Sequence, residues 1–188
     1  VTGETGPGSS MPPAGSSSHG THVAGISAGQ SYEGTEFSGV AKDGSIIGIQ
    51  VFLGAGVNPD DPDSIPQGYY AKTVDIISGL ERVLELSTSF NIASANMSLG
   101  GGSGSSGNDY CDDESPAAKA AIDNLRYVGI ATVIASGNEG RTNGQSWPAC
   151  YSTGISVGST QVKNPDNSYN TDNVSSFSNS SPVLNLLA

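Results

Sequence analysis

Residues 115–135 read SPAAKAAIDNLRYVGIATVIA and combine a helix, a helix stop and a strand. Ser115 is a typical helix N-cap residue, Pro116 suits the first helical position, and Gly129 is typical of the residue after a helix end. The run that follows, 130–135, is short, apolar and β-branched, as expected of a strand that is buried on both faces. This stretch therefore predicts a helix that leads directly into a buried strand.

The same alternation continues on both sides of this stretch. Apolar runs predict further strands, and helical spacing of apolar residues predicts another helix. The predicted strands cover 45–52, 92–98 and 154–159, and the predicted helix covers 71–87. Strand–helix–strand alternation predicts an α/β fold with three layers, in which a mostly parallel sheet carries helices on both faces. In such sheets the functional residues lie just beyond the carboxyl ends of the strands.

The composition limits the partners of this chain. At 188 residues it is long enough for one domain with a sizeable core. Its 18 acidic and 7 basic residues give a net charge of −11, which argues against nucleic acid or an anionic membrane as a partner. No apolar run approaches the about 20 residues of a membrane-spanning helix.

The two cysteines, Cys111 and Cys150, are the only thiols of the chain. Neither has a CxxC neighbour, which makes a zinc knuckle a poor interpretation. A pair in an acidic chain rich in Ser, Asn and Gly favours a disulfide and an oxidising compartment, with two free buried thiols as the alternative.

Two short motifs resemble functional signatures but lack the required context. GSGSSG at 102–107 matches a dinucleotide-binding pattern, but the acidic residues that follow it would repel a pyrophosphate, so we expect a flexible loop. GISVG at 154–158 matches a nucleophile elbow, but Ser156 lies inside a strand pattern and no helix follows.

Metal sites have weak support in the sequence. His19 and His22 are three residues apart and lack the intervening Glu of a zinc protease motif. The acidic stretches 58–63 and 109–114 offer oxygen ligands for a structural calcium ion, with a solvated loop as the alternative.

Three motifs occur in a defined order: HGTHVAG at 19–25, NMSLGG at 96–101 and ASGNEG at 135–140. Together they resemble the subtilisin-like serine proteases, the subtilase or peptidase S8 family, and the resemblance covers essentially residues 18–188. It implies a secreted, extracellular protease that acts on proteins or peptides and needs no cofactor for its chemistry.

The resemblance also implies roles for individual residues. Ser18 is expected to cap a helix that begins at His19, which would be the catalytic general base, and His22 would be structural. Asn138, in a glycine turn, would donate a hydrogen bond to the oxyanion formed during catalysis. The expected substrate-binding residues form two walls of the P1 pocket: Ser98, Leu99 and Gly100 on one side, and Ala135, Ser136 and Gly137 on the other.

Two parts of the family's triad have no match in the 188 residues. No Asp-Thr-Gly motif precedes His19, and Glu4-Thr5-Gly6 is too close to it and follows no strand. No Gly-Thr-Ser-Met-Ala motif occurs either. We therefore expect residues 1–188 to be a single, partial catalytic domain with a flexible lead-in at 1–17. Such a piece would be inactive alone and prone to self-association.

A second functional class stays open. The chain could be a non-catalytic relative of these proteases that binds peptides or a partner protein. An intact gene ending at these boundaries would favour that reading, whereas flanking segments with the two missing motifs would favour the protease.

Overall fold

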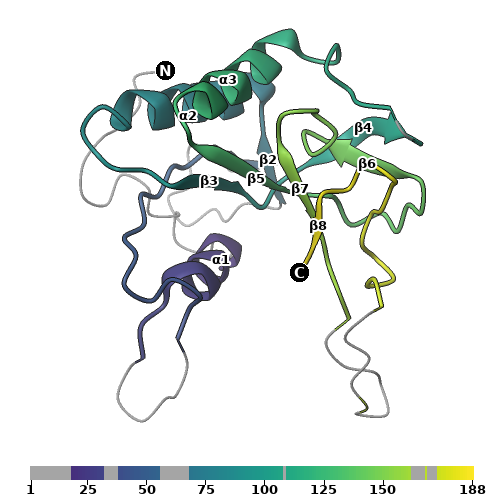
Figure 1. The fold of residues 1–188 in the computed structure, drawn as a ribbon, viewed down its shortest axis with the longest axis horizontal. Helices are drawn as coiled ribbons and strands as arrows, with labels where there is room; N and C mark the ends of the chain where they lie inside the picture. Colours follow the sequence, from purple (N-terminus) through teal and green to yellow (C-terminus); the bar gives the residue numbers. More distant parts are fainter. Residues whose placement is uncertain (1–17, 32–37, 56–67, 108, 162–167, 169–172) are drawn as a thin grey trace. The chain divides into compact units, whose positions relative to one another are not determined.

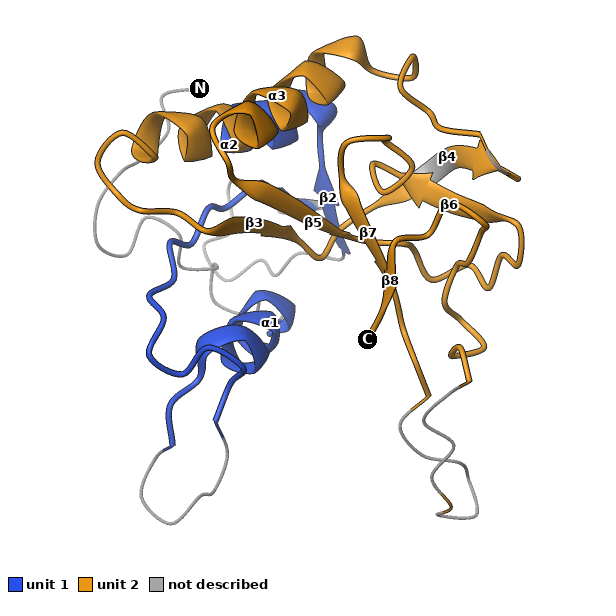
Figure 2. Ribbon diagram, viewed as in Figure 1, with its two compact units in different colours: residues 1–79 blue, residues 80–188 orange. Residues whose placement is uncertain are grey.

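The structure, a computed structural model, describes residues 18–31, 38–55, 68–107, 109–161, 168 and 173–188. The chain forms two compact units, residues 1–79 and residues 80–188 (Figure 2). Each unit is described by itself below. Among the described residues, no helix has both the length and the apolar character needed to cross a membrane.

The first unit contains helix α1 (His19–Ala28) and an antiparallel pair of strands, β1 (Phe52–Ala55) and β2 (Gly68–Ala71). The last carbonyls of α1 are satisfied by the returning chain, because the Val40 amide donates to Ile26 at 3.0 Å. Helix α2 (Thr73–Leu86) begins in this unit and confirms the helix predicted over 71–87.

The strand predicted over 45–52 is wrong in position and burial. Only Phe52 lies in a strand, and residues 45–51 have no strand structure. Ile46 and Ile47 are 51% and 45% exposed rather than buried. An apolar, β-branched run becomes a strand only where a neighbouring segment completes its hydrogen bonds. No described segment pairs with residues 45–51.

The second unit is built on a four-stranded parallel sheet in the order β3-β5-β7-β8 (Figure 1). The predicted strands over 92–98, 130–135 and 154–159 are confirmed as β3 (Ser94–Met97), β5 (Ala131–Ala135) and β7 (Ile155–Gly158). A short strand, β8 (Leu186–Leu187), adds to the edge of β7. The α/β class and the mostly parallel sheet are therefore confirmed.

Helix α3 (Pro116–Tyr127) packs on β5, and its Leu125 is completely buried. It starts and ends where the sequence predicts, with Pro116 first and Gly129 at a φ of 84° beyond the end. Ser115 has the extended backbone of an N-cap residue, but its side chain makes no capping hydrogen bond. Instead, the Ser115 carbonyl accepts a hydrogen bond from the buried Tyr151 hydroxyl at 3.0 Å.

The flexible loop predicted for GSGSSG is wrong. Residues Gly101–Ser106 form strand β4, which pairs antiparallel with β6 (Gly144–Trp147). A Cβ atom at Gly104 would overlap the carbonyl of Gln145, so the two backbones approach as closely as only glycine allows. The glycines that indicate a loop in the sequence instead permit tight strand pairing.

The predicted disulfide between Cys111 and Cys150 is confirmed, with the two Cα atoms 5.4 Å apart. It links the segment before α3 to the segment between β6 and β7. The Cys111 amide also donates to the Cys150 carbonyl at 3.0 Å, and the Asp112 carboxylate accepts hydrogen bonds from both the amide and the hydroxyl of Ser152. These contacts hold the start of α3 to the turn before β7.

Candidate active site

Two loops leave the same edge of the parallel sheet. Strands β3 and β5 are neighbours, with Met97 opposite Ile134. The segment Ser98–Gly100 follows β3, and the segment Ser136–Gly140 follows β5. Because parallel strands end at the same edge, the sheet brings together the two predicted walls of the P1 pocket.

The second of these loops is held by a segment from near the end of the described chain, residues 177–180, which we call the clamp segment. Among the residues from 136 to 141, each except Asn138 has a hydrogen bond to it. The Ser136 hydroxyl donates to the Asn179 carbonyl at 2.8 Å, and the Asn179 amide donates to the Gly137 carbonyl at 3.0 Å. The amide of Gly140 donates to the Phe177 carbonyl at 2.8 Å.

The side chain of Asn179 makes the remaining contacts of the clamp segment to this loop. Its Oδ1 accepts from the backbone amides of Glu139 and Arg141 at 3.2 and 3.0 Å. The two hydrogens of its Nδ2 are shared among three acceptors: the Ser136 carbonyl at 3.1 Å, Ser146 Oγ at 3.0 Å and the Glu139 carboxylate at 2.5 Å. Asn179 itself has no exposed surface.

Asn138 stands out from this arrangement. It is exposed, and its side chain has no hydrogen bond to another described residue. Gly137 and Gly140 flank the turn at φ values of 112° and 64°, conformations that favour glycine. The loop therefore presents one amide side chain outward from an otherwise hydrogen-bonded backbone.

Glu139, the next residue of the same turn, is also exposed, and its carboxylate is hydrogen-bonded. It accepts a hydrogen bond from the Ser146 hydroxyl at 2.6 Å in addition to the one from Asn179. The Ser146 hydrogen bond is the main cause that lowers the pKa of Glu139, and it outweighs the effect of burial, which raises it. The charged form of Glu139 is thus favoured in the folded chain.

The predicted wall residues differ in what they expose. Ser98 and Leu99 are half-buried, and Asn96 donates to the Ser98 hydroxyl at 3.0 Å. Ala135 is exposed, whereas Ser136 is buried and its hydroxyl is committed to the clamp segment. Backbone and small side chains therefore line this edge, and no charged side chain of the two walls does.

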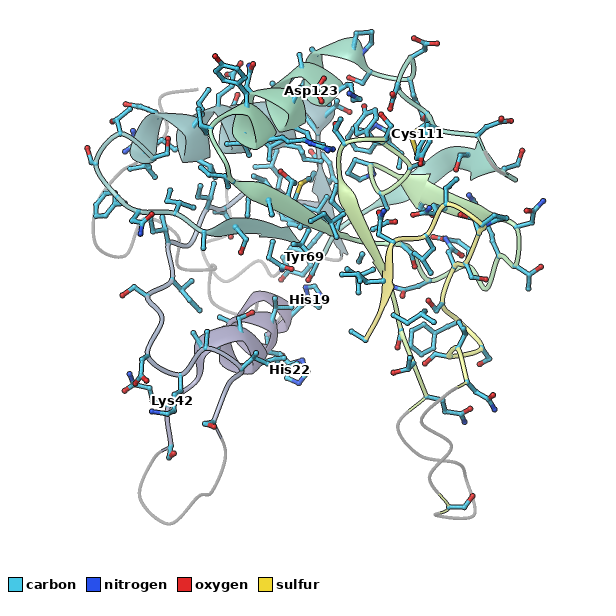
Figure 3. All side chains as sticks on the ribbon, in the orientation of Figure 1. His19, His22, Lys42, Tyr69, Cys111 and Asp123 are labelled. Atoms are coloured by element: carbon cyan, nitrogen blue, oxygen red, sulfur yellow. A yellow bond between two sulfur atoms is a disulfide. The ribbon has the colours of Figure 1, made fainter. Side chains whose placement is uncertain are left out.

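His19 is the first residue of α1, as predicted, and both His19 and His22 project from this helix (Figure 3). The predicted Ser18 cap is wrong, because the Ser18 side chain makes no capping hydrogen bond. Its backbone has a φ of −78° and a ψ of 1° rather than the extended conformation of an N-cap, and its carbonyl accepts from the His22 amide at 2.9 Å. His19 belongs to the first unit, whereas Asn138 and both walls belong to the second.

Calcium binding by the two acidic stretches stays a prediction. The stretch 58–63 lies outside the described residues. In the stretch 109–114, both carboxylate oxygens of Asp112 are committed to Ser152. Among the described residues, the one cluster of three potential metal ligands is Cys111, Glu114 and Cys150, whose two sulfurs form the disulfide and are not thiolates.

Ser156 is not a nucleophile at an exposed elbow. It lies within β7 and is 1% exposed. Its amide and its hydroxyl both donate to Asn185 Oδ1 at 2.9 Å. The rejection of GISVG as a nucleophile elbow is therefore confirmed.

The sequence analysis missed Asn179 and Ser146 as parts of this site. Asn179 lies in the run FSNSSP, where neighbouring polar residues give no signal that one of them is buried. The one indication in the sequence was that Asn179 lies within the residues over which the chain resembles the family.

Comparison with known proteins identifies the family of this chain. A family model described as the subtilase family matches residues 3–188. The chain is 32% identical over 170 residues to alkaline protease 1 of Aspergillus flavus, covering 90% of this chain and 33% of that protein. It is 33% identical over 146 residues to an extracellular basic protease of Dichelobacter nodosus, covering 77% of this chain and 21% of that protein.

Solved structures give the same result. A cold-adapted subtilisin-like serine proteinase shares 30% identity at a TM-score of 0.59, with 90% of this chain and 48% of that chain covered. The chain spans about a third of the length of curated relatives such as the Aspergillus flavus protease. With three motifs in order, a parallel sheet that joins two of them, and a family model that matches almost its whole length, this chain belongs to the subtilase family of serine proteases.

Proposed function

We propose that this chain is part of a secreted subtilisin-like serine endopeptidase that hydrolyses peptide bonds. In this proposal it supplies the general base His19, the oxyanion donor Asn138 and the two walls of the P1 pocket. The observation that supports it best is the loop after β5, in which Asn138 is exposed and is the one residue of 136–141 without a hydrogen bond to the clamp segment.

The proposed chemistry gives His19 the proton transfers and Asn138 the stabilisation of the oxyanion. His19 removes the proton from a serine hydroxyl as that oxygen attacks the scissile carbonyl, and later returns the proton to the leaving amine. The Asn138 amide donates a hydrogen bond to the carbonyl oxygen as it becomes negative. Loss of such a donor in subtilisin lowers kcat by about 100- to 1000-fold.

The proposed substrate is a protein or peptide with a large apolar or aromatic residue at P1. The two walls consist of small or apolar residues, and neither offers a carboxylate to pair with Lys or Arg. The segment 98–100 follows β3 and the segment 135–137 lies at the end of the neighbouring β5, so both occur at the same edge of the sheet, which supports a shared substrate pocket.

The acid and the nucleophile of the triad are proposed to come from coding sequence that flanks these 188 residues. Neither Asp-Thr-Gly nor Gly-Thr-Ser-Met-Ala occurs within them. The chain alone is therefore proposed to be inactive, because His19 has no serine to activate and no carboxylate to orient its imidazole. A structural calcium ion bound by acidic side chains of 58–63 or 109–114 remains part of the proposal.

The experiment compares two proteins on an activated peptide ester. The first is the 188-residue chain, and the second is the same chain extended by its flanking coding sequence. We expect only the extended protein to hydrolyse the ester. In that protein, His19→Ala should abolish hydrolysis, whereas folded His22→Ala should retain it. Activity of the 188-residue chain that disappears on His19→Ala would overturn the assignment of the missing groups. An extended protein that binds peptides without hydrolysing them would favour a non-catalytic binding module.

A further inference from the structure

We propose that Asn179 is the positioning residue of the oxyanion site: its buried amide fixes the loop on both sides of Asn138. This inference rests on the proposed role of Asn138 as oxyanion donor. Asn179 lies 41 positions after Asn138 in the sequence (179 − 138) and has no role in binding a substrate, because it has no exposed surface.

The hydrogen bonds of Asn179 are directed to the residues that flank Asn138. Nδ2 donates to the carbonyl of Ser136, two residues before it, and Oδ1 accepts from the amides of Glu139 and Arg141, which follow it. The side chain thereby spans the turn from one side of Asn138 to the other. It fixes the direction in which Asn138 leaves the backbone without contacting the Asn138 side chain.

The chemistry of this position requires an amide. A carboxamide has two N–H donors and a carbonyl acceptor, and Asn179 uses both kinds of group. An aspartate has the same shape and could still accept from Glu139 and Arg141. It has no hydrogen to donate to Ser136, and its charge would face the Glu139 carboxylate, which the Asn179 amide contacts at 2.5 Å.

The loop depends on the hydrogen bonds of Asn179 because its own backbone can adopt many conformations. Gly137 and Gly140 both have positive φ values, and glycine has the widest range of backbone conformations. A displacement of about 1 Å in a catalytic group can lower turnover by about 100-fold. A loop with two such glycines needs an external constraint to hold Asn138 in one place, and the buried amide of Asn179 supplies it.

The test is a double-mutant cycle in the extended protease, using Asn138→Ala, Asn179→Asp and the double variant. We expect Asn179→Asp to lower kcat by about 10- to 100-fold with KM changed less than about threefold, since the donor acts on the transition state. In the Asn138→Ala background we expect Asn179→Asp to have almost no further effect on kcat, because a residue that acts through Asn138 has nothing left to position.

Asn185→Ala is the matched control. Asn185, like Asn179, lies within residues 173–188, and its Oδ1 accepts two hydrogen bonds from Ser156 rather than from the loop after β5. We expect it to lower stability without a selective loss of kcat. Hydrogen exchange of the 188-residue chain gives a second readout: the Glu139 and Arg141 amides should lose protection in Asn179→Ala, which removes their acceptor, and keep it in Asn185→Ala.

The outcomes separate the two proposals. If Asn138→Ala lowers kcat but the fold-losses of kcat from the two single substitutions multiply in the double variant, the positioning role of Asn179 is overturned. The proposed protease function then stands. If Asn138→Ala leaves kcat unchanged, the oxyanion assignment fails, and the positioning role fails with it. Unchanged protection of Glu139 and Arg141 in Asn179→Ala would also overturn the positioning role.

Discussion

Gly137 is the residue at which the loop after β5 depends most on the absence of a side chain. Its φ is 112°, and a Cβ atom there would overlap Asn179 Nδ2 and would lie 2.6 Å from Ser146 Oγ and 2.7 Å from the Glu139 carboxylate. Both the backbone strain and the steric overlap oppose any other residue. Gly129 also has a positive φ, but a Cβ atom there would contact no other atom.

We expect Gly137→Ala to lower the free energy of unfolding by about 3 kcal/mol and Gly129→Ala by about 1 kcal/mol, from the typical cost of strained backbone. Gly129 is the matched control because its φ is 84° but no atom lies within 4 Å of its Cβ position. Urea denaturation of both variants measures the difference. Equal losses would show that backbone strain alone, and not the contact with Ser146 and Glu139, determines the cost.

The carboxylate of Glu139 makes a pH-dependent contribution at the same turn. Hydrogen bonds from Ser146 and Asn179 lower its pKa below the ordinary value. A lowered pKa in the folded state means that this stability is present above the unfolded pKa and is lost as the pH falls through the folded one. The contribution is modest, because Glu139 is largely exposed to solvent.

The second prediction is that Glu139→Gln costs about 1 kcal/mol at neutral pH and that the difference from the wild type shrinks as the pH falls below the ordinary pKa of a glutamate, about 4.3. A protonated glutamate and a glutamine are both neutral, so the two proteins should converge in acid. Denaturation midpoints across this pH range measure it. A difference that stays constant over the range would contradict the role of the charge.

At the scale of elements, the disulfide closes a separation of 39 residues that contains α3, β5 and β6. Closing a loop of this length stabilises the folded state by about 4 kcal/mol in the chain-entropy model. Since α3 and β5 form the buried centre of the second unit, the disulfide constrains the elements that carry the candidate site.

The third prediction follows from this loop. The double variant Cys111→Ser and Cys150→Ser should lose about 4 kcal/mol of unfolding free energy. Wild-type protein in reductant should show a similar loss, whereas the double variant should not respond to reductant at all. A wild type with the same urea midpoint in oxidising and reducing buffer would contradict a stabilising bond.

At the scale of the whole molecule, the parallel sheet has outer strands with exposed residues. In the strand order of the second unit, β3 and β8 are the outer strands. Leu186 and Leu187 of β8 are 56% and 47% exposed. An exposed strand with apolar side chains is a surface on which another chain can pair.

The fourth prediction is that the 188-residue chain self-associates at micromolar concentration. Light scattering after size exclusion should give a mass that rises with protein concentration. Leu187→Lys should reduce the association, because a charge on an outer strand opposes pairing with a second chain. A single monomer mass at all concentrations for the wild type would contradict this prediction.

The family, the order of most elements and the places of the two candidate wall segments at the ends of β3 and β5 could be predicted from the sequence. Local signals are sufficient where the physics is local: Pro116 and Gly129 mark the ends of α3, and the β-branched run after Gly129 forms β5. The turn around Asn138 is equally local, because two nearby glycines permit its shape.

Only the tertiary structure decided the features that depend on a distant partner. Residues 45–51 have the composition of a strand but no described neighbour to pair with, whereas the glycine-rich β4 is a strand because β6 lies beside it. The amide of Asn179 reaches Ser136 across 43 positions of sequence. Periodicity and turn residues predict the structure of the chain only within a few positions. A buried hydrogen bond forms wherever folding brings its donor and acceptor together, so neither segment alone predicts the partner.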